Sequence, residues 1–525
     1  MLVIAYALLE TAYVLRLPMV MDEFDGAYEA YHLRFALPYR DFTPYKTVIG
    51  YYIETAAAFW PGAVWPRIAA IKIELVLINA VMLAAAALFL RRRLDGRAVA
   101  ASLLLLVACS NFLERSGELR VDMLTAWAGM WSLLFLLERR VALAGALCGL
   151  AFLVSQKGAL YFVAANAALG VYWLWKERSR QRLSDLVAFE VAFAAVVAAY
   201  VAFWSMFASP AIVLRSTFTA AASQALNHAY AIRWHYWSQF LLQNPVPIAL
   251  AAVAIAVLMR TKPFVAIYSL TLLVQGALYT QPWPYFFVLL LPTLFVLHAH
   301  FFAEWRTVPS AAAAAIVIAG VLYPALRIPV ALARDSAYQR YNVRLASAML
   351  GPAETYLAGN DIIHDHEQTL PILHRLGGQD LEALGRRSEP DLELIVRQLD
   401  AAPPKLVIGN YRVYSLPPTV LRYIGLHYRR LSGSILAYAP LLDPGSSAID
   451  LRFAGRYRIA PLTPGAIAVD GAPHRGGDDV RLTAGRHDVA TQVPLRLRLL
   501  PDGIESLLDP QYLDEWDFYP HVYDY

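Results

Sequence analysis

The chain of 525 residues is 58% hydrophobic and only 16% charged, whereas soluble domains are about 45–50% apolar and about 25% charged. This composition excludes a simple soluble enzyme and an intrinsically disordered protein. The net charge of +4 is not arranged as a basic stripe with interleaved aromatic residues, so nucleic-acid binding is not expected. Both cysteines, Cys109 and Cys148, lie inside apolar runs and indicate no disulfide framework.

Apolar runs follow one another from residue 1 to about residue 325. A membrane-spanning helix needs about 20 mostly apolar residues. The pattern predicts spans at 1–20, 68–90, 98–112, 123–137, 141–156, 158–175, 186–207, 245–259, 264–280, 285–303 and 308–326. The sequence therefore predicts a polytopic α-helical membrane protein with about eleven transmembrane helices in residues 1–328, and long outer loops at 21–67 and 208–244.

Lysine and arginine gather in one set of short loops, which places that set in the cytoplasm. These loops contain Arg91–Arg93 with Arg97, Arg139 and Arg140, Lys176 to Arg182, Arg260 and Lys262, and Arg306. The N-terminus is then inside, and an odd number of spans places the C-terminal region in the periplasm or at the cell exterior. For a bacterial chain, the membrane is the inner (cytoplasmic) one. The amphipathic outer loop 21–67 predicts short helices at the interface.

Charged residues gather at the outer ends of the predicted helices. Ionisable groups at membrane depth are costly unless they are paired or hydrated, so each is a functional candidate. The outer clusters include Asp22 and Glu23 after the first span, Lys46 in the long loop, Asp122 before the fourth span, and Lys157. Lysine is rare, with six residues against 39 arginines, and an ammonium group binds phosphate as a point charge.

The C-terminal region reads as two soluble units. Residues 329–442 mix helical and strand patterns and predict a small α/β domain. Residues 443–525 alternate in hydropathy and contain Asp470-Gly471, which predicts hairpins and a small β-sandwich, followed by an aromatic tail that we expect to dock. His364 and His366 share one strand face, but a surface loop is favoured over a metal site because no second ligand cluster is in view.

The order of the motifs in residues 1–325 resembles the GT-C glycosyltransferases. Within them it is similar to the branch that includes protein O-mannosyltransferases, the lipid A aminoarabinose transferase and bacterial lipopolysaccharide-core transferases. The matching motifs are Asp22-Glu23, Pro44-Tyr45-Lys46, Arg67, Asp122, Lys157-Gly158 and the stretch from Tyr285 to Pro292. Residues 395–440 also look like the periplasmic domain of some bacterial members. The resemblance implies a GT-C-like membrane domain.

The resemblance also implies a reaction and roles for these residues. A sugar would pass from a polyprenyl-phosphate donor to the hydroxyl of a glycolipid, polysaccharide or protein acceptor, with inversion. Asp22 would be the general base, and Glu23 or Asp122 would orient the acceptor. Lys46, Lys157 and Arg67 would bind the donor phosphate, and Tyr45, Tyr285 and His235 would line the substrate site. No cofactor or metal ligand is assigned, although a divalent cation held by Asp22 and Asp122 stays open.

Simpler structural explanations stay open for several of these residues. Asp122 suits a helix N-cap, Lys157 suits a snorkelling lysine, and Lys72 suits a structural pair with Glu74. The aromatic residues around His235 and Tyr285 suit an interfacial belt. The alternative function is a secondary transporter or lipid flippase, but such proteins often show internal repeats and polar groups near mid-membrane.

Overall fold

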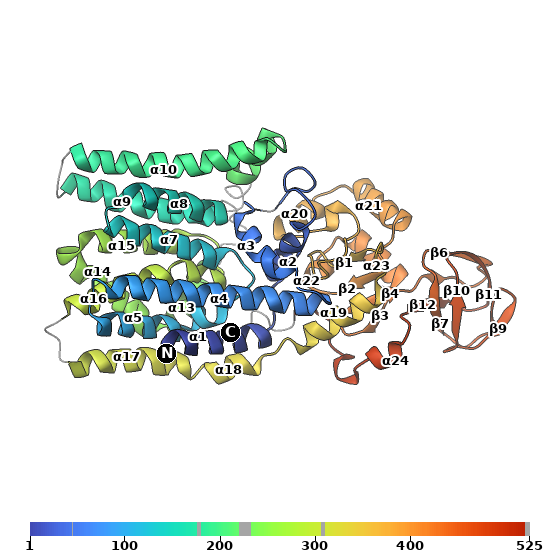
Figure 1. Cartoon of the computed structure of the whole chain (residues 1–525). Coiled ribbons are helices and arrows are strands. Elements are labelled where there is room, and N and C mark those ends of the chain that lie inside the picture. Colours follow the sequence, from blue (N-terminus) through green and yellow to red (C-terminus); the bar gives the residue numbers. More distant parts are fainter. Residues whose placement is uncertain (45, 176–179, 220–232, 306–309, 520–525) are drawn as a thin grey trace.

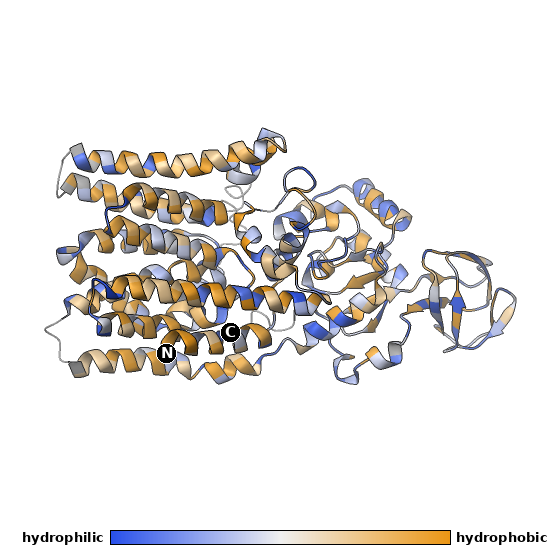
Figure 2. Cartoon of the chain, viewed as in Figure 1, coloured by the Kyte–Doolittle hydropathy of each residue, from blue (hydrophilic) through white to orange (hydrophobic). Residues whose placement is uncertain are grey.

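The computed structural model describes residues 1–44, 46–175, 180–219, 233–305 and 310–519. A bundle of long helices forms one part of the molecule, and the C-terminal sheets lie beyond one end of that bundle (Figure 1). Hydrophobic residues run along the bundle helices, whereas hydrophilic and hydrophobic residues are mixed in the C-terminal part (Figure 2). This division matches the one that the composition predicts.

Each of the eleven predicted spans corresponds to a helix. These helices are α1 (Leu2–Arg16), α4 (Val64–Arg91), α5 (Gly96–Ala108), α7 (Asp122–Leu137), α8 (Val141–Val154), α9 (Ala159–Trp175), α10 (Arg180–Ser205), α14 (Pro245–Thr261), α15 (Pro263–Leu278), α16 (Leu291–Glu304) and α17 (Ser310–Ala325). Within the described residues, Val64–Arg91, Leu183–Ser205 and Ala311–Met349 are long and apolar enough to cross a membrane, and two bent helix pairs raise that number to five. The count of eleven spans stays a prediction.

The outside of the bundle is apolar, as lipid contact requires. Leu77, Val81 and Leu88 on α4 and Val187 and Val191 on α10 are all more than half exposed. Packing inside the bundle is close, with Trp127 of α7 and Tyr161 of α9 among the largest fully buried side chains. An apolar exterior around a packed interior is the arrangement of a helical membrane domain.

Among the described residues, further helices lie in the connections between the long ones and after the last of them. They are α2 (Met21–His32), α3 (Ile49–Ala58), α6 (Ser110–Arg115), η1 (Gln156–Gly158), α11 (Pro210–Leu214), η2 (Arg215–Thr219), α13 (Arg233–Gln243), η4 (Pro284–Leu289), α18 (Ile328–Ala333) and α19 (Ala337–Met349). The loop 21–67 thus contains α2 and α3, in agreement with its amphipathic pattern. α2 and α3 lie between the bundle and the C-terminal region (Figure 1).

The α/β part of the C-terminal region is built on a four-stranded sheet of order β1-β2-β4-β3. Its strands are β1 (Tyr356–Leu357), β2 (Leu406–Ile408), β3 (Tyr428–Ser432) and β4 (Ile435–Tyr438), and only the β1–β2 pair is parallel. Its helices are η5 (Pro371–Leu373), α20 (Gly378–Gly385), α21 (Glu389–Ala401), α22 (Tyr411–Tyr414) and α23 (Pro418–His427). α21 packs with one apolar face, since Leu392, Ile395 and Leu399 are buried.

The β-rich part consists of two four-stranded sheets, of order β10-β7-β12-β5 and β6-β11-β8-β9. The strands are β5 (Leu441–Leu442), β6 (Ala448–Leu451), β7 (Gly455–Pro461), β8 (Ile467–Val469), β9 (Ala472–His474), β10 (Asp479–Leu482), β11 (Gly485–Thr491) and β12 (Leu495–Leu500), followed by α24 (Ile504–Leu507) and η6 (Pro510–Tyr512). Asp470 and Gly471 form the predicted hairpin turn between β8 and β9, with φ of 50° and 78°. The domain boundaries at 328 and 442 stay predictions.

The aromatic tail docks, as expected, on both the sheet region and the helical part. The Phe518 ring lies 5.4 Å from that of Phe24 in α2, edge to face, and the Phe518 backbone N–H donates to Gly409. The Tyr519 hydroxyl accepts a hydrogen bond of 2.6 Å from Asn360. Residues 520–525 of the tail lie outside the described residues.

Candidate active site

Asp22 is the second residue of α2, and the end of α1 determines where it lies. α1 ends at Arg16 because Pro18 disfavours helical geometry at Leu17, whose φ and ψ are −62° and 144°. α2 begins at Met21 and is bent by 98° from the axis of α1. The side chain of Asp22 is 39% exposed, so its carboxylate remains accessible to a substrate.

α2 lies directly on the segment 116–121, which joins α6 to α7. Gly26 permits this approach, because a Cβ there would lie 2.8 Å from the carbonyl oxygen of Leu119. The buried guanidinium of Arg120 pairs with Asp22 and, through Nε, with Oδ2 of Asp122 at 3.1 Å. Arg120 therefore bridges two carboxylates that lie far apart in the sequence.

Lys157 lies in the connection between α8 and α9 and reaches the carboxylate of Asp122. Its Nζ lies 2.7 Å from Oδ1 of Asp122. The tight turn that carries Lys157 needs Gly158, because a Cβ there would lie 2.3 Å from the backbone carbon of Ala151. The N-cap of α7 is Val121, without a side-chain capping bond. The two carboxylate oxygens of Asp122 form ion pairs with Arg120 and Lys157. Asp122 does not cap α7, so its interpretation as a helix cap is wrong.

Lys46 and Tyr285 complete the group. The charges of Asp122 and Asp22 act on Lys46, whose pKa is lowered chiefly by burial. The Tyr285 ring centroid lies 3.3 Å from the guanidinium carbon of Arg120 and 5.0 Å from Nζ of Lys157, which are cation–π distances. We call Asp22, Lys46, Arg120, Asp122, Lys157 and Tyr285 the outer cluster. Tyr45, also predicted to line the site, lies outside the described residues.

The outer cluster has three cations and two carboxylates, and these charges shift the pKa values of its members. Burial raises the pKa of Asp22, but Arg120 and Lys46 outweigh it and lower that pKa to about 2. Burial lowers the pKa of Lys157 to about 8, although Asp122 opposes the shift. The cations hold the pKa values of both carboxylates below their usual range, against the effect of burial. The cluster therefore favours an anion with several negatively charged oxygens.

The cluster does not suit a metal ion held by Asp22 and Asp122. The guanidinium of Arg120 lies between the two carboxylates, where a divalent cation would have to bind both. Lys157 takes the second oxygen of Asp122. We therefore assign no metal to this site.

Glu23 lies beside Asp22 but faces the protein interior. Its carboxylate is 1% exposed, and it accepts hydrogen bonds of 3.0 Å from the backbone N–H groups of Val20 and Leu119. Nζ of Lys72 lies 2.8 Å from the same carboxylate. The expected Lys72–Glu74 pair is wrong, since Glu74 accepts instead from a backbone N–H of α3. Glu23 thus joins α2, α4 and the segment that carries Arg120, and its oxygens are already occupied.

Arg67 lies at the start of α4 and makes contacts different from those the sequence predicts. Its guanidinium lies 2.7 Å from Nε2 of His364 and 3.4 Å from Oδ2 of Asp365, and it stacks over Tyr31. Among the described residues, these contacts join Arg67 to the C-terminal region rather than to the outer cluster. His364 is fully buried, so the expected surface loop around it is also wrong.

His235 is not brought into the outer cluster either. It lies on α13 with its side chain exposed, and its Nε2 is 3.3 Å from Nε2 of Gln239. Its ring also contacts that of Tyr236. These local contacts agree with the interfacial aromatic belt that stayed open for this segment.

Arg120 is the residue of the outer cluster that the sequence pattern did not single out. It stands in the charged run from Glu114 to Asp122, but arginine is common in this chain and gave no reason to single it out. Its position two residues before Asp122 did not predict their ion pair, because Val121 between them has helical φ and ψ of −68° and −7°.

Fold and site define a polytopic membrane protein of the GT-C fold, with carboxylates and cations gathered at one end of the helical bundle. The chain is similar to the crystal structure of ArnT from Cupriavidus metallidurans bound to undecaprenyl phosphate, with a TM-score of 0.54 and 13% sequence identity. The similarity covers 84% of this chain and 92% of that one. It confirms the predicted fold class. No family model and no curated protein sequence matches the chain.

Proposed function

We propose that this protein is a membrane glycosyltransferase that transfers a hexose or pentose from a polyprenyl-phosphate donor to an extracytoplasmic hydroxyl, with inversion. The acceptor is a glycolipid, polysaccharide or protein, and the protein works at the outer face of the bacterial inner membrane with its C-terminal region in the periplasm. The observation that carries the proposal is the outer cluster, in which three cations lie with two carboxylates at the bundle end, the accessible one of Asp22 and the buried one of Asp122. The similarity to ArnT supports it, because that protein was crystallised with undecaprenyl phosphate.

The cations of the outer cluster suit the phosphate of the donor. Arg120 and Lys157 pair with Asp122 and lie over the ring of Tyr285, and the charge of Lys46 also acts on Asp122. As the sugar–phosphate bond breaks, negative charge grows on the lipid phosphate. Pre-arranged cations in a partly dry site stabilise that charge more than water does, so the departing phosphate needs no general acid.

Asp22 is the base in this proposal, and donor binding activates it. In the absence of substrate, Arg120 holds the pKa of Asp22 low, which makes Asp22 a weak base. A bound phosphate draws the guanidinium of Arg120 toward itself and adds negative charge nearby. Both effects raise the pKa of Asp22, so the carboxylate becomes basic enough to take a proton from the acceptor hydroxyl only when donor is present.

The test measures cleavage of labelled undecaprenyl-phosphate sugars by protein in lipid nanodiscs. Glucose, mannose and aminoarabinose donors are compared, and sugar released to water or transferred to lipid is counted. One of these donors is expected to be turned over. Asp22→Asn should lower kcat by about 10²–10⁴-fold, the range for loss of a general base. Turnover at the wild-type rate in a folded Asp22→Asn protein would remove Asp22 from the mechanism.

Asp41→Asn is the matched control. Asp41 lies in the same outer loop, is similarly exposed at 35% and is also paired with an arginine, Arg40, but it lies outside the outer cluster. The activity of this variant should stay within about twofold of the wild type.

Movement of a fluorescent undecaprenyl-phosphate analogue across the bilayer without any cleavage would instead show a flippase.

A further inference from the structure

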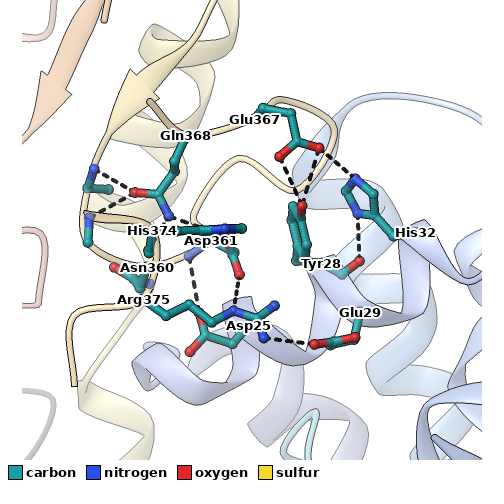
Figure 3. A network of polar contacts seen from close by, with 12 residues as sticks. Asp25, Tyr28, Glu29, His32, Asn360, Asp361, Glu367, Gln368, His374 and Arg375 are labelled. Carbon is teal, nitrogen blue, oxygen red and sulfur yellow. Dashed lines mark hydrogen bonds and ion pairs between the residues drawn. The ribbon is translucent and has the colours of Figure 1, made fainter. Parts of the chain in front are cut away.

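α2 is held not only at its start, where Glu23 binds the segment 116–121, but also along its length by residues 360–375 of the C-terminal region. Figure 3 shows this second contact, in which Asp25, Tyr28, Glu29 and His32 of α2 face the segment. Because Asp22 is on the same short helix, any force that sets the position of α2 also sets the position of the proposed base.

Arg375 is at the centre of this contact. Its Nη1 lies 2.8 Å from Oε1 of Glu29, and its Nε lies 2.8 Å from Oδ2 of Asp361. The backbone N–H of Asp361 donates to Oδ1 of Asp25 at 3.1 Å. Glu29 and Asp361 are 1% and 0% exposed. One guanidinium thus joins a buried carboxylate of α2 to a buried carboxylate of the C-terminal region (Figure 3).

The loop that presents Asp361 and Arg375 is itself closed by hydrogen bonds. Gln368 accepts from the backbone N–H groups of Ala358 and Gly359 at 2.9 Å and donates to Asp361. Nε2 of His374 contacts the same Asp361 oxygen, Oδ1. These bonds fix Asp361 independently of α2, so the ion pair connects α2 to a rigid support.

Further along α2, the contact continues at the molecular surface. Glu367 accepts hydrogen bonds from the Tyr28 hydroxyl at 3.0 and 3.2 Å, and it pairs with Nε2 of His32 at 3.2 Å. From Asp25 to His32 the segment therefore follows α2 for two helical turns. Such a length of contact resists both sliding and rotation of the helix.

The charges around Asp25 explain why Arg375 is needed there. Burial and the facing carboxylate of Asp361 raise the pKa of Asp25, while Arg375 and Arg412 oppose that shift. The pKa of Asp361 is lowered by Arg375 and His374 against the effect of burial. Removing the guanidinium would leave buried carboxylates facing one another, and breaking a buried pair in this way displaces the groups that carry it.

We propose that Arg375 is a positioning residue, which acts through Glu29, Asp361 and Asp25 to hold α2 so that Asp22 stays beside Arg120. The proposal rests on the proposed function, because it needs Asp22 as the base. A catalytic group displaced by about 1 Å can cost about 10²-fold in rate. The C-terminal region then belongs to the catalytic machinery, although Arg375 itself does not touch the substrate.

The test compares Arg375→Ala and Arg375→Lys with the wild type in nanodiscs. Donor cleavage gives kcat and KM, and native mass spectrometry gives the Kd for undecaprenyl phosphate. Arg375→Ala should lower kcat by about 10–100-fold and change Kd by less than about threefold, because Lys46, Arg120 and Lys157 remain. Arg375→Lys should recover part of kcat. An unchanged kcat, or a Kd that rises in step with the loss of kcat, would overturn the proposal.

Lys405→Ala is the matched control. Lys405 pairs with Glu354 at 2.7 Å in the same C-terminal region. The side chain of Lys405 is 16% exposed, similar to that of Arg375 at 21%. In the hydrogen bonds and ion pairs of the described residues, Lys405 and Glu354 make no contact with α2. The Lys405→Ala variant should keep kcat within about twofold. If Arg375→Ala does not fold, Arg375→Lys and Glu29→Gln carry the comparison, and wild-type kcat in both would overturn the proposal.

A double-mutant cycle separates a positioning role from general damage. If Arg375 acts through Asp22, Arg375→Ala should reduce the residual cleavage of Asp22→Asn by less than about threefold. A full and additive loss would show that Arg375 acts elsewhere. The two proposals fail differently: a fully active Asp22→Asn protein removes the base, whereas an inactive Asp22→Asn with a fully active Arg375→Ala removes only the positioning role.

Discussion

The outer cluster and the contact between α2 and residues 360–375 are built from similar groups but with opposite balance. In the outer cluster three cations face two carboxylates, and Asp22 remains 39% exposed. At the second contact Asp25, Glu29, Asp361 and Glu367 are gathered around Arg375 and two histidines. The first has a cationic surplus that suits a further anion, whereas in the second the cations present are used to hold the carboxylates.

The comparison predicts different roles for the arginines at the two sites. Arg120 and Arg375 both bridge two carboxylates and both lie over a tyrosine ring. They differ in exposure, because the Asp22 carboxylate paired with Arg120 is 39% exposed, whereas both carboxylates paired with Arg375 are buried. An arginine in the outer cluster should therefore affect lipid-phosphate affinity, and an arginine at the second contact should not.

Among the variants that test this comparison, Arg120→Gln is expected to have the largest effect on kcat and Kd. Loss of the guanidinium removes stabilisation of the leaving phosphate, so kcat for donor cleavage should fall by about 10²–10³-fold. The Kd for undecaprenyl phosphate, measured by native mass spectrometry, should rise at the same time. An unchanged Kd would place Arg120 with the structural arginines and would break the distinction.

A smaller effect is expected from pH through Lys157. Because burial lowers the pKa of Lys157 to about 8, its ammonium is present below that pH and is lost as the pH rises above it. Affinity for undecaprenyl phosphate should therefore fall above pH 8, by at most about tenfold per pH unit, the slope for one linked proton.

Lys157→Arg checks the assignment, because a guanidinium stays charged throughout this range. In that variant the affinity should vary little between pH 7 and 9.5. Lys262→Arg is the control, since Lys262 is half exposed and pairs loosely with Glu304, and it should keep the wild-type profile. A pH profile that survives in Lys157→Arg would assign the titration to another group.

The smallest effect on binding is expected from Arg67→Ala. The sequence predicts Arg67 in the donor phosphate site, but the structure joins it to His364 and Asp365. Its loss should lower stability by about 1–3 kcal/mol, seen in thermal unfolding, and should change Kd for undecaprenyl phosphate by less than about threefold. A tenfold weaker Kd would restore the sequence-based assignment.

Local pattern was enough for the helices and for part of the site. Hydropathy is a property of neighbouring residues, so the ranges of α4, α7 and α8 follow directly from it. Sidedness follows from the positions of charges in the loops, and it brings Asp22, Asp122 and Lys157 to one face before any packing is known. Their convergence in the structure agrees with that expectation.

Tertiary structure alone decided how these charges pair. Arg120 and Asp22 are 98 residues apart in the sequence, and Arg375 and Glu29 are 346 apart, so no local pattern distinguishes a bridging arginine from a solvated one. Glu23 and Asp22 are neighbours in the sequence, yet Glu23 is buried and paired with Lys72, whereas Asp22 is accessible. The sequence determined a GT-C-like membrane helix bundle with charged residues gathered at one end. The packing of α2 between that bundle and the C-terminal region decided which of those charges are buried in pairs and which stay accessible, because burial and pairing depend on contacts between distant segments.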